Sequence, residues 1–366
     1  MATTLQPTLT HTSDKSMTAK AYGVTSPTSA VRPLTIERRA LRPEDVAIKI
    51  SHCGICHTDL HFAHNDFGMS LYPMVPGHEF AGTVIAVGSA VTRYKVGDRV
   101  GVGCLIDSCR SCEFCKSGHE QFCIEMPTFT YSAPDRQSGE PTQGGYSDSI
   151  VVREEFVCRI PDSIDLEHAA PLLCAGITTY SPLKRWGLKP NDRIAVVGLG
   201  GLGHMTVKMA KAMGADVTVL TTSPEKADAA RSLGAEDVII STDGQAMQSL
   251  AGRFNIVVDT IPVSHEIQTY IDLLRPGGTL VVLGALAPLP GINGFNLIFG
   301  NRAVAGSIIG GLPETQEMLD FCAAHAIVPD IEIIAPEKIN DAFETLARGD
   351  VPHRFVLDMS AIDESA

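Results

Sequence analysis

Long apolar runs and clusters of basic residues are both missing from this sequence of 366 residues. The longest apolar stretch, from Thr279 to Ala287, is interrupted by glycine and is much shorter than the roughly 18 residues of a membrane span. The 29 lysines and arginines form no run and are outnumbered by 42 aspartates and glutamates, which gives a formal charge of −13. Because nucleic-acid affinity depends on basic residues that displace counterions, we expect neither a membrane nor a nucleic acid as a partner.

A secretory signal is also missing from the N-terminus. Residues 1–16 are rich in threonine and serine and have neither a basic start nor an apolar core, so we expect a flexible leader there. The ten cysteines are then expected to stay reduced in the cytoplasm, where metal binding or catalysis is a more common role for them than disulfide formation.

The apolar pattern changes along the chain. Between about residues 46 and 102 it is short and close to period two, as in Val46, Ile48 and Ile50, which predicts an irregular β region. From about Asp192 apolar strands alternate with helical stretches, which is typical of a parallel sheet with crossover helices. The predicted fold class is therefore α/β combined with a mainly β region.

A glycine-rich loop follows the first strand of the alternating region. Gly198 permits the tight turn, Gly200 lets the backbone approach a pyrophosphate, and Gly203 lets the helix approach the strand. Gly201 and Leu202 complete the loop, and the N–H groups at the start of the helix would face the phosphates. This arrangement predicts a dinucleotide site, against the alternative of an ordinary glycine-rich turn.

The end of the next strand indicates which dinucleotide binds. An NAD site places a carboxylate there, but this chain has Thr221. The hydroxyls of Thr222 and Ser223 and the ammonium of Lys226 would instead hold a 2′-phosphate, so the sequence favours NADP(H). In the alternative interpretation Lys226 is only a solvated charge and Glu225 serves NAD.

Four closely spaced cysteines form a C-x2-C-x2-C-x7-C pattern: Cys109, Cys112, Cys115 and Cys123. Four thiolates at this spacing predict a closed tetrahedral zinc site, with an iron–sulfur cluster as the weaker alternative. Because protein ligands occupy every position, the predicted role of this zinc is structural.

A second possible ligand set is dispersed over the chain. It comprises Cys56, His78 and Cys174, and two thiolates with one imidazole would leave a fourth position open, as in a catalytic zinc site. Cys53 and Cys56 alone also match a thioredoxin-like dithiol, but the surrounding β pattern does not supply the βαβ context that such a motif requires.

These motifs together resemble the zinc-dependent medium-chain alcohol dehydrogenases. The resemblance rests on the four cysteines, on the Gly-His-Glu of residues 77–79, and on residues 54–61, 174–180 and 198–203. It covers roughly Thr18 to Met359. Within the family the chain is most similar to the cinnamyl alcohol dehydrogenase-like, NADP-dependent aldehyde reductases, to which 72–79 and 141–145 also point.

The resemblance implies two domains. Residues 17–170 and 310–366 would form a GroES-like catalytic domain, with a structural zinc lobe at about 104–124, around a Rossmann domain of residues 171–309 that has a doubly wound parallel sheet. It also implies a homodimer, in which the strand near Ala305 to Ile309 could pair across the dimer axis.

The resemblance further assigns roles to the site residues. Cys56, rather than Cys53, would bind the catalytic zinc with His78 and Cys174, so that each chain holds two zinc ions. Glu79 would approach the ion when water or product leaves, and Asp59 would orient His78. Other implied roles are the proton relay (Thr58, His61), contact with the cofactor pyrophosphate (His57) and the substrate pocket (Phe62, Phe67, Met69, Cys104, Leu286).

The predicted function is hydride transfer between NADP(H) and a primary alcohol/aldehyde pair, with small-molecule aldehydes, aromatic or medium aliphatic, as substrates. Lignin-type plant members carry a tryptophan after the fourth lobe cysteine, but the only tryptophan here is Trp186, which favours a broader aldehyde reductase. An NAD-dependent polyol or secondary-alcohol dehydrogenase is the enzymatic alternative. A zinc-ribbon binding or scaffold protein is the alternative without catalysis.

Overall fold

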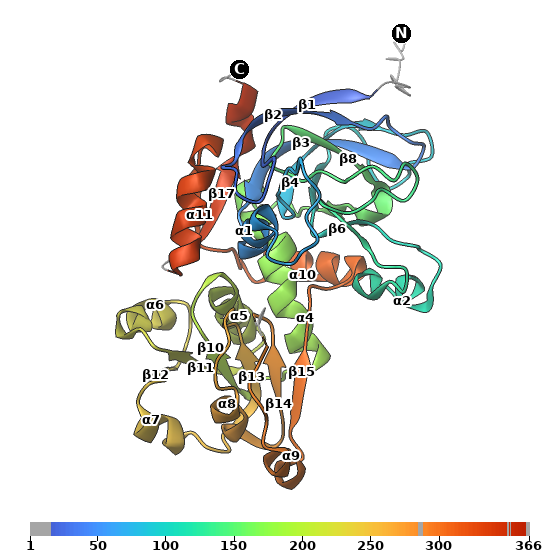
Figure 1. Cartoon of the computed structure of the whole chain (residues 1–366). Helices are drawn as coiled ribbons and strands as arrows, with labels where there is room; N and C mark the ends of the chain where they lie inside the picture. The colour runs from blue at the N-terminus through green and yellow to red at the C-terminus, as the bar shows by residue number, and fades with distance from the viewer. Residues whose placement is uncertain (1–15, 285–287, 350, 352, 364–366) are drawn as a thin grey trace, which may run out of the picture. The chain divides into compact units, whose positions relative to one another are not determined.

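The computed structural model describes residues 16–284, 288–349, 351 and 353–363 (Figure 1). Contacts divide the chain into two compact units. The first unit contains the residues up to Leu173 together with Glu332–Ala347 and the segment from Phe355 onward. The second contains Cys174–Ile331 and Arg348–Arg354. Among the described residues, none of the helices combines the length and the apolar character of a membrane span.

The first unit is built on a seven-stranded sheet with the order β16-β17-β3-β4-β5-β9, in which β8 also pairs with β3. A separate antiparallel ribbon of β1 and β2 and a short pair of β6 and β7 complete its strands. The strand bounds are β1 Met17–Gly23, β2 Arg32–Arg38, β3 Asp45–Gly54, β4 Phe80–Val87, β5 Arg99–Val102, β6 Leu105–Asp107, β7 Thr128–Phe129, β8 Ser149–Arg153, β9 Cys158–Arg159, β16 Ile331–Ile334 and β17 Arg354–Asp358.

Val46, Ile48 and Ile50 in β3 are all fully buried, as the apolar pattern predicts, but the strand does not alternate strictly, because Ala47 is buried as well. The C-terminal strand β17 pairs antiparallel with β3, with Leu357 opposite Cys53. Two segments far apart in the sequence therefore build this sheet, because β17 is added beside β3.

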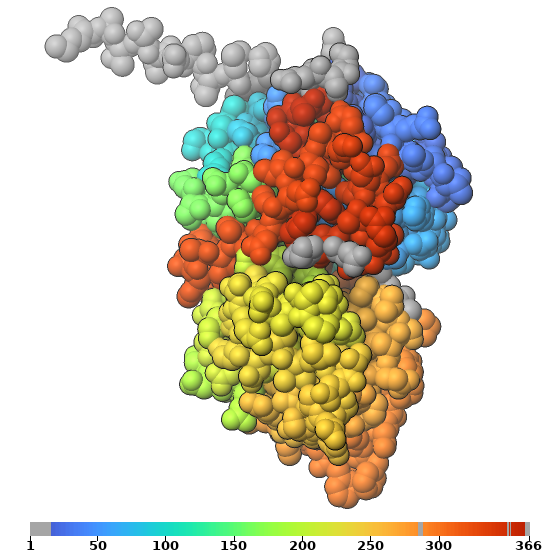
Figure 2. Space-filling view, turned by 90° about the vertical axis from the view of Figure 1, so that its left-hand side faces the viewer, coloured from blue at the N-terminus to red at the C-terminus, as the bar shows by residue number. Residues whose placement is uncertain are grey.

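Short helices surround this sheet: α1 His57–His64, α2 Glu113–Lys116, α3 Leu166–Pro171 and α11 Ile339–Arg348, with 3-10 turns η1 Glu120–Phe122, η2 Glu154–Phe156, η5 Pro336–Lys338 and η6 Met359–Asp363. Helix α11 buries Ile339, Ala342, Phe343 and Leu346, the spacing of an amphipathic helix. Figure 2 shows the red surface of the C-terminal segment beside the blue surface of the first strands, where Tyr22 donates to Glu337 over 2.8 Å.

The second unit contains a six-stranded parallel sheet with the order β12-β11-β10-β13-β14-β15, and helices cover it (Figure 1). Its core includes Val197, Phe254 and Leu280. The strands are β10 Arg193–Val197, β11 Asp216–Thr221, β12 Asp237–Ile240, β13 Phe254–Asp259, β14 Leu274–Val282 and β15 Ala303–Gly306. The helices are the π turn η3 Leu172–Gly176, α4 Ile177–Arg185, α5 Gly201–Ala212, η4 Pro224–Lys226, α6 Ala227–Ser232, α7 Gly244–Ser249, α8 Gln268–Asp272, α9 Gly294–Gly300 and α10 Leu312–Ala324.

The strand order, with β10 next to both β11 and β13, is that of a doubly wound dinucleotide-binding sheet, so the predicted fold class is confirmed. Contacts group residues 310–331 with this second unit, whereas the sequence analysis assigned them to the catalytic domain. The reason is that α10 packs against α4, where Tyr180 donates to Glu317 over 2.9 Å.

Candidate functional site

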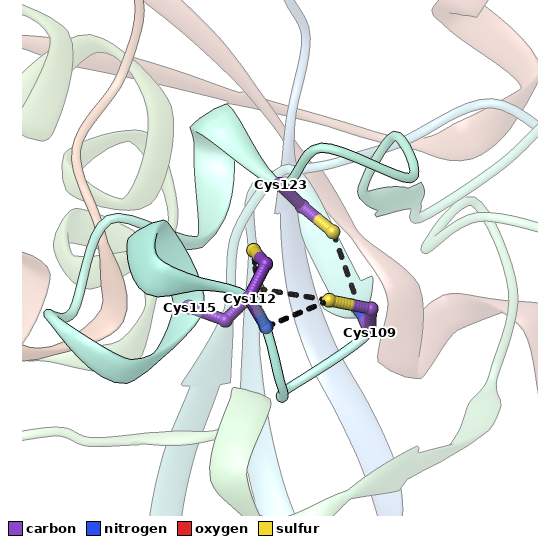
Figure 3. A group of neighbouring side chains, drawn as sticks. All are labelled: Cys109, Cys112, Cys115 and Cys123. Carbon is purple, nitrogen blue, oxygen red and sulfur yellow. Dashed lines mark hydrogen bonds between the residues drawn. The ribbon is translucent and has the colours of Figure 1, made fainter.

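The four lobe cysteines converge on one point (Figure 3). Their sulfur atoms all lie within 4.8 Å of one another, and each thiol is free of any disulfide. Helix α2 supplies Cys115 and begins after Cys112, while the turn η1 leads into Cys123. A set of four sulfurs without a competing carboxylate fits a closed tetrahedral zinc site.

Hydrogen bonds in the lobe favour thiolates. The backbone N–H of Cys112 donates to Cys109 Sγ over 3.3 Å, and the N–H of Cys109 donates to Cys123 Sγ over 3.3 Å. The Ser111 side chain and backbone, followed by the Cys112 backbone, lower the pKa of Cys109 to about 6. Burial instead raises the pKa of the Cys115 thiol to about 12. The donors of the lobe thus favour the thiolate at Cys109, which is the form that zinc binds.

A second group of ligand atoms brings together Cys56, His78 and Cys174, also within 4.8 Å of one another. Cys56 is the N-cap of α1, His78 precedes β4, and Cys174 lies in the π turn η3. His78 and Cys174 are buried and Cys56 is half-buried. Two thiolates and one imidazole match the ligand set of a zinc ion that keeps an open position.

The π turn around Cys174 is a feature that the sequence analysis missed. It follows Pro171, which lacks a backbone N–H and so cannot donate the regular hydrogen bond of an α-helix. Single π turns inside α-helices occur often at functional sites. Here the wider turn carries one member of the dispersed ligand group.

Asp59 holds two of the ligand segments together. Its Oδ1 accepts from His78 Nδ1 over 2.9 Å and from the N–H of Gly77 over 3.0 Å. Its Oδ2 accepts from the N–H of Cys56 over 3.0 Å and from the Tyr146 hydroxyl over 3.1 Å. Burial lowers the pKa of His78, but the Asp59 carboxylate outweighs burial and raises the pKa well above its usual value. With Nδ1–H committed to Asp59, Nε2 is the ring atom left to bind a metal.

Two tyrosines border this network and were not identified from the sequence. Tyr131 Oη lies 3.2 Å from His78 Nδ1, and Tyr146 Oη donates to Asp59. Burial, followed by the nearby Asp59 charge, raises the pKa of both phenols well above its usual value, so both remain protonated. The only sequence signal was that Tyr146 directly follows the Gly-Gly pair at 144–145.

Cys53 does not belong to the metal group. It is fully buried, and burial followed by the charges of Asp59 and Glu79 raises the pKa of its thiol well above the usual value. Glu79 is also fully buried and packs against Gly54, where a Cβ would lie 2.3 Å from Glu79 Oε1. The geometry thus groups Cys56, and not Cys53, with His78 and Cys174.

The predicted relay residues lie on α1. Thr58 Oγ1 is 3.6 Å from Cys56 Sγ, and His61 Nδ1 is 2.7 Å from Asp66 Oδ2 on the more exposed side. His57 Nε2 is 2.9 Å from the carbonyl oxygen of Leu346. Its predicted contact with a pyrophosphate stays a prediction.

Aromatic rings gather near His61 and Tyr131. The Phe62 ring lies 5.3 Å from Phe67 and 5.2 Å from Tyr131, and the Phe67 ring lies 5.5 Å from His61. Among the other pocket candidates, the Cys104 thiol is close enough to influence the His78 pKa, Met69 is 54% exposed, and Leu286 lies outside the described residues.

The glycine loop has the geometry that each glycine was expected to provide. Gly198 has a φ of 88°, Gly200 has open space where a Cβ would point, and a Cβ on Gly203 would lie 2.2 Å from the Gly198 carbonyl oxygen. Helix α5 begins at Gly201 and continues through Leu202, so its first N–H groups lie at the loop. This arrangement fits a bound pyrophosphate.

The end of β11 carries polar groups but no carboxylate. Thr221 is buried, and its Oγ1 accepts from the N–H of Ser223 over 3.1 Å, which fixes the turn into η4. Thr222 is exposed, and Ser223 and Lys226 are half-buried. The hydroxyl and ammonium groups of this turn fit a 2′-phosphate.

Comparison with known proteins agrees with this geometry. Residues 42–162 match the alcohol dehydrogenase GroES-like domain, and residues 201–324 match the zinc-binding dehydrogenase family. The chain belongs to the zinc-binding alcohol dehydrogenases. It is therefore an oxidoreductase, and the family resemblance seen in the motifs is confirmed.

Individual relatives cover almost the whole chain. NADP-dependent alcohol dehydrogenase C 1 of Mycolicibacterium smegmatis is 51% identical over 94% of this chain and 99% of its own length. Aldehyde reductase YahK of Escherichia coli is 48% identical over 93% of this chain and 98% of its own length. The solved structure of a Sorghum bicolor cinnamyl alcohol dehydrogenase is 43% identical, with a TM-score of 0.91 over 94% of this chain and 98% of that one.

Proposed function

We propose that this chain is a zinc-dependent, NADP(H)-linked dehydrogenase that interconverts aldehydes and primary alcohols, with aldehyde reduction as its main direction. The grouping of Cys56, His78 and Cys174 within 4.8 Å is the observation that carries the proposal, because three ligands leave the open position that catalysis needs. The names of the relatives above, which include NADP-dependent, aldehyde reductase and cinnamyl alcohol dehydrogenase, support the cofactor and the substrate class.

The two bound groups would supply the central chemistry: zinc polarises a carbonyl as a Lewis acid, and NADPH carries the hydride. Cys56, His78 and Cys174 would hold the catalytic zinc, and the four lobe cysteines the structural one. The loop from Gly198 to Gly203 would hold the pyrophosphate, while Thr222, Ser223 and Lys226 would hold the 2′-phosphate.

The chain's own residues would position the substrate and move the proton. The Thr58 hydroxyl, beside Cys56, is placed to pass a proton to the product oxygen. His61 would return that proton from solvent, and Asp66 Oδ2, 2.7 Å from His61 Nδ1, would orient the imidazole ring. The rings of Phe62 and Phe67 provide apolar surface for an aromatic or medium aliphatic aldehyde.

A panel of aldehydes tests the proposal. Purified enzyme should contain two zinc ions per chain and should reduce aromatic and medium aliphatic aldehydes with NADPH, with higher kcat/KM for NADPH than for NADH. Activity confined to polyols or secondary alcohols with NAD would instead support the enzymatic alternative. A purified chain that is folded, binds no zinc when zinc is supplied and reduces no aldehyde would contradict the proposal.

We also propose that two copies associate through the β15 edge of the second unit. β15 is the terminal strand of the six-stranded sheet, and α9, which packs near β14, exposes Phe295, Ile298 and Phe299 by 65–78%. An unpaired strand edge beside exposed apolar side chains favours pairing with another chain. Sedimentation should give a dimer mass, and Phe299→Glu should shift the chain toward the monomer.

The proposed location is the cytoplasm. None of the ten cysteines, all of which lie in the described part of the chain, forms a disulfide, and both proposed metal groups depend on the reduced state. Fractionation of cells that express a tagged chain should recover it with cytoplasmic markers, whereas recovery in an oxidising compartment would contradict this location.

A further inference from the structure

The Asp59 carboxylate is saturated with hydrogen bonds. Each of its two oxygens accepts two donors at 2.9–3.1 Å, the full capacity of a carboxylate, and the Tyr131 hydroxyl interacts with the same group. Asp59 has no exposed surface, so water does not compete for these positions. A donor that is lost here is therefore not replaced by solvent.

Three of the four donors belong to the metal-ligand segments themselves. They are the N–H of Cys56, the N–H of Gly77 and the ring N–H of His78. Through Asp59, the start of α1 is tied to the loop before β4, so the carboxylate sets the separation between Cys56 and His78. The fourth donor, the Tyr146 hydroxyl, comes from a segment that contributes no metal ligand.

Tyr146 is itself held firmly. It is fully buried, its N–H donates to the Pro76 carbonyl oxygen over 3.0 Å, and its own carbonyl accepts from the N–H of Tyr22 over 2.8 Å. Its ring packs against the backbone of Gly77, where a Cβ would lie 2.6 Å from Tyr146 Cδ1. Gly77 has a φ of 101°, which glycine adopts without strain, so the close approach is built into the backbone.

The guanidinium of Arg38 fixes the loop that carries Tyr146. Nε donates to the Ser149 carbonyl oxygen over 2.9 Å, and Nη2 donates to the Gly144 carbonyl oxygen over 2.7 Å and to Ser147 Oγ over 2.6 Å. These contacts lie on both sides of residue 146. The Tyr146 hydroxyl therefore has a fixed position from which to donate to Asp59.

We infer that Tyr146 is a positioning residue for the catalytic metal centre, acting through Asp59 on Cys56 and His78. This inference rests on the proposed function, because it requires a metal at that centre. The Tyr146 hydroxyl donates to Asp59, and its effect passes through this carboxylate, which both ligand segments share.

The test is the zinc affinity of the two centres in Tyr146→Phe. We expect competition with a chelator to show a zinc affinity at the Cys56, His78 and Cys174 centre that is about 10- to 100-fold weaker, the range seen when a group that orients metal ligands is removed. The four-cysteine zinc in the same molecule should keep its affinity. In cobalt-substituted protein, the visible absorption of the three-ligand centre should shift in this variant.

Tyr94→Phe is the matched control, because the buried Tyr94 hydroxyl also donates one hydrogen bond within the first unit, to the Val157 carbonyl oxygen. This control should retain both zinc affinities. Placing 4-aminophenylalanine at position 146 restores a donor of similar size and should recover most of the lost affinity.

A double-mutant cycle with Asp59→Asn tests the route of action. If Tyr146 acts through Asp59, adding Tyr146→Phe to Asp59→Asn should change the zinc affinity by less than about twofold. Additive effects in the cycle would overturn the inference, as would an unchanged affinity in Tyr146→Phe. Failure of Tyr146→Phe to fold, or loss of both zinc ions, would show a general structural role and would also overturn it.

The wild-type metal content separates this inference from the proposed function. A wild-type chain that binds zinc only at the four cysteines would overturn the proposed function and this inference with it. Two zinc ions in the wild type, with no effect of Tyr146→Phe, would overturn this inference alone.

Discussion

The two proposed groups of metal ligands are built in opposite ways. The four lobe cysteines come from a single stretch of 15 residues, and backbone N–H groups of that same stretch donate to their sulfurs. The ligands of the other group come from three segments, with His78 22 positions after Cys56 and Cys174 96 positions after His78. Their supporting contacts also come from distant parts of the chain, as Tyr146 does.

This difference matches the chemistry expected at each site. A local closed set can stabilise a small lobe but has no coordination position to offer a substrate. An assembled set with three ligands depends on the completed fold, and it gains an open position in return. The following predictions test whether the two centres are independent and differ in role as this comparison implies.

Loss of an assembled ligand should have the largest effect on turnover. Lewis-acid stabilisation is worth several kcal/mol, so we expect Cys56→Ala to lower kcat/KM by at least about 10³-fold. Metal analysis should find one zinc lost and the lobe zinc kept. Cys53→Ala, the control in the same motif, should retain both zinc ions, and an active Cys56→Ala enzyme would refute hydride transfer at this zinc.

Loss of a lobe ligand should mainly affect stability. Zinc gives about 10–16 kcal/mol of apparent binding energy in zinc-finger peptides. Even a loss on the order of 3 kcal/mol from Cys112→Ser would lower the thermal midpoint by roughly 6–12 °C. The kcat/KM at low temperature should stay within about threefold of the wild type. Ser117→Ala, a substitution at an exposed position of the same lobe, should leave both the thermal midpoint and kcat/KM unchanged. Loss of activity in fully folded Cys112→Ser would contradict a purely structural role for the lobe.

The buried His204 lies outside both proposed metal groups, and its effect on acid stability serves as a comparison for them. Burial, with Lys208 as the next cause, lowers the pKa of His204 on α5 to about 4. In the unfolded chain this histidine binds a proton near pH 6.5. Its contribution to the free energy of unfolding is therefore fully present above pH 6.5 and is lost as the pH falls toward 4, by up to about 3 kcal/mol. Unfolding in urea at pH 7 and pH 4.5 should show a smaller loss for His204→Met, and an equal loss in both proteins would contradict this assignment.

The smallest expected effect concerns cofactor choice. A carboxylate beside the 2′-phosphate costs at least about 1 kcal/mol, so Thr221→Asp should lower kcat/KM for NADPH by roughly tenfold and raise the use of NADH. Thr221→Val removes the hydroxyl without adding charge and serves as the control. Unchanged cofactor preference in Thr221→Asp would argue against this site for the 2′-phosphate.

The sequence predicted the fold class, and its motifs named the side chains that the structure gathers in the two cysteine-containing groups, because these depend on residue type and on local spacing. It did not predict the surroundings of Asp59. Gly77 and Tyr146 are 18 and 87 residues away from it, and no spacing rule connects them. The π turn at Cys174 was also missed, since it differs from an α-helix in backbone hydrogen bonding rather than in composition.

The buried Arg38 suggests an order of events in forming the centre. Its side chain donates hydrogen bonds to carbonyl and hydroxyl oxygens of residues 143–149, and burial lowers its pKa to about 9 although the Asp148 charge acts in the opposite direction. None of these bonds involves a metal ligand, so the loop can adopt its shape before any ion arrives. We therefore expect the zinc-free enzyme to have a preformed site and to bind zinc with little refolding.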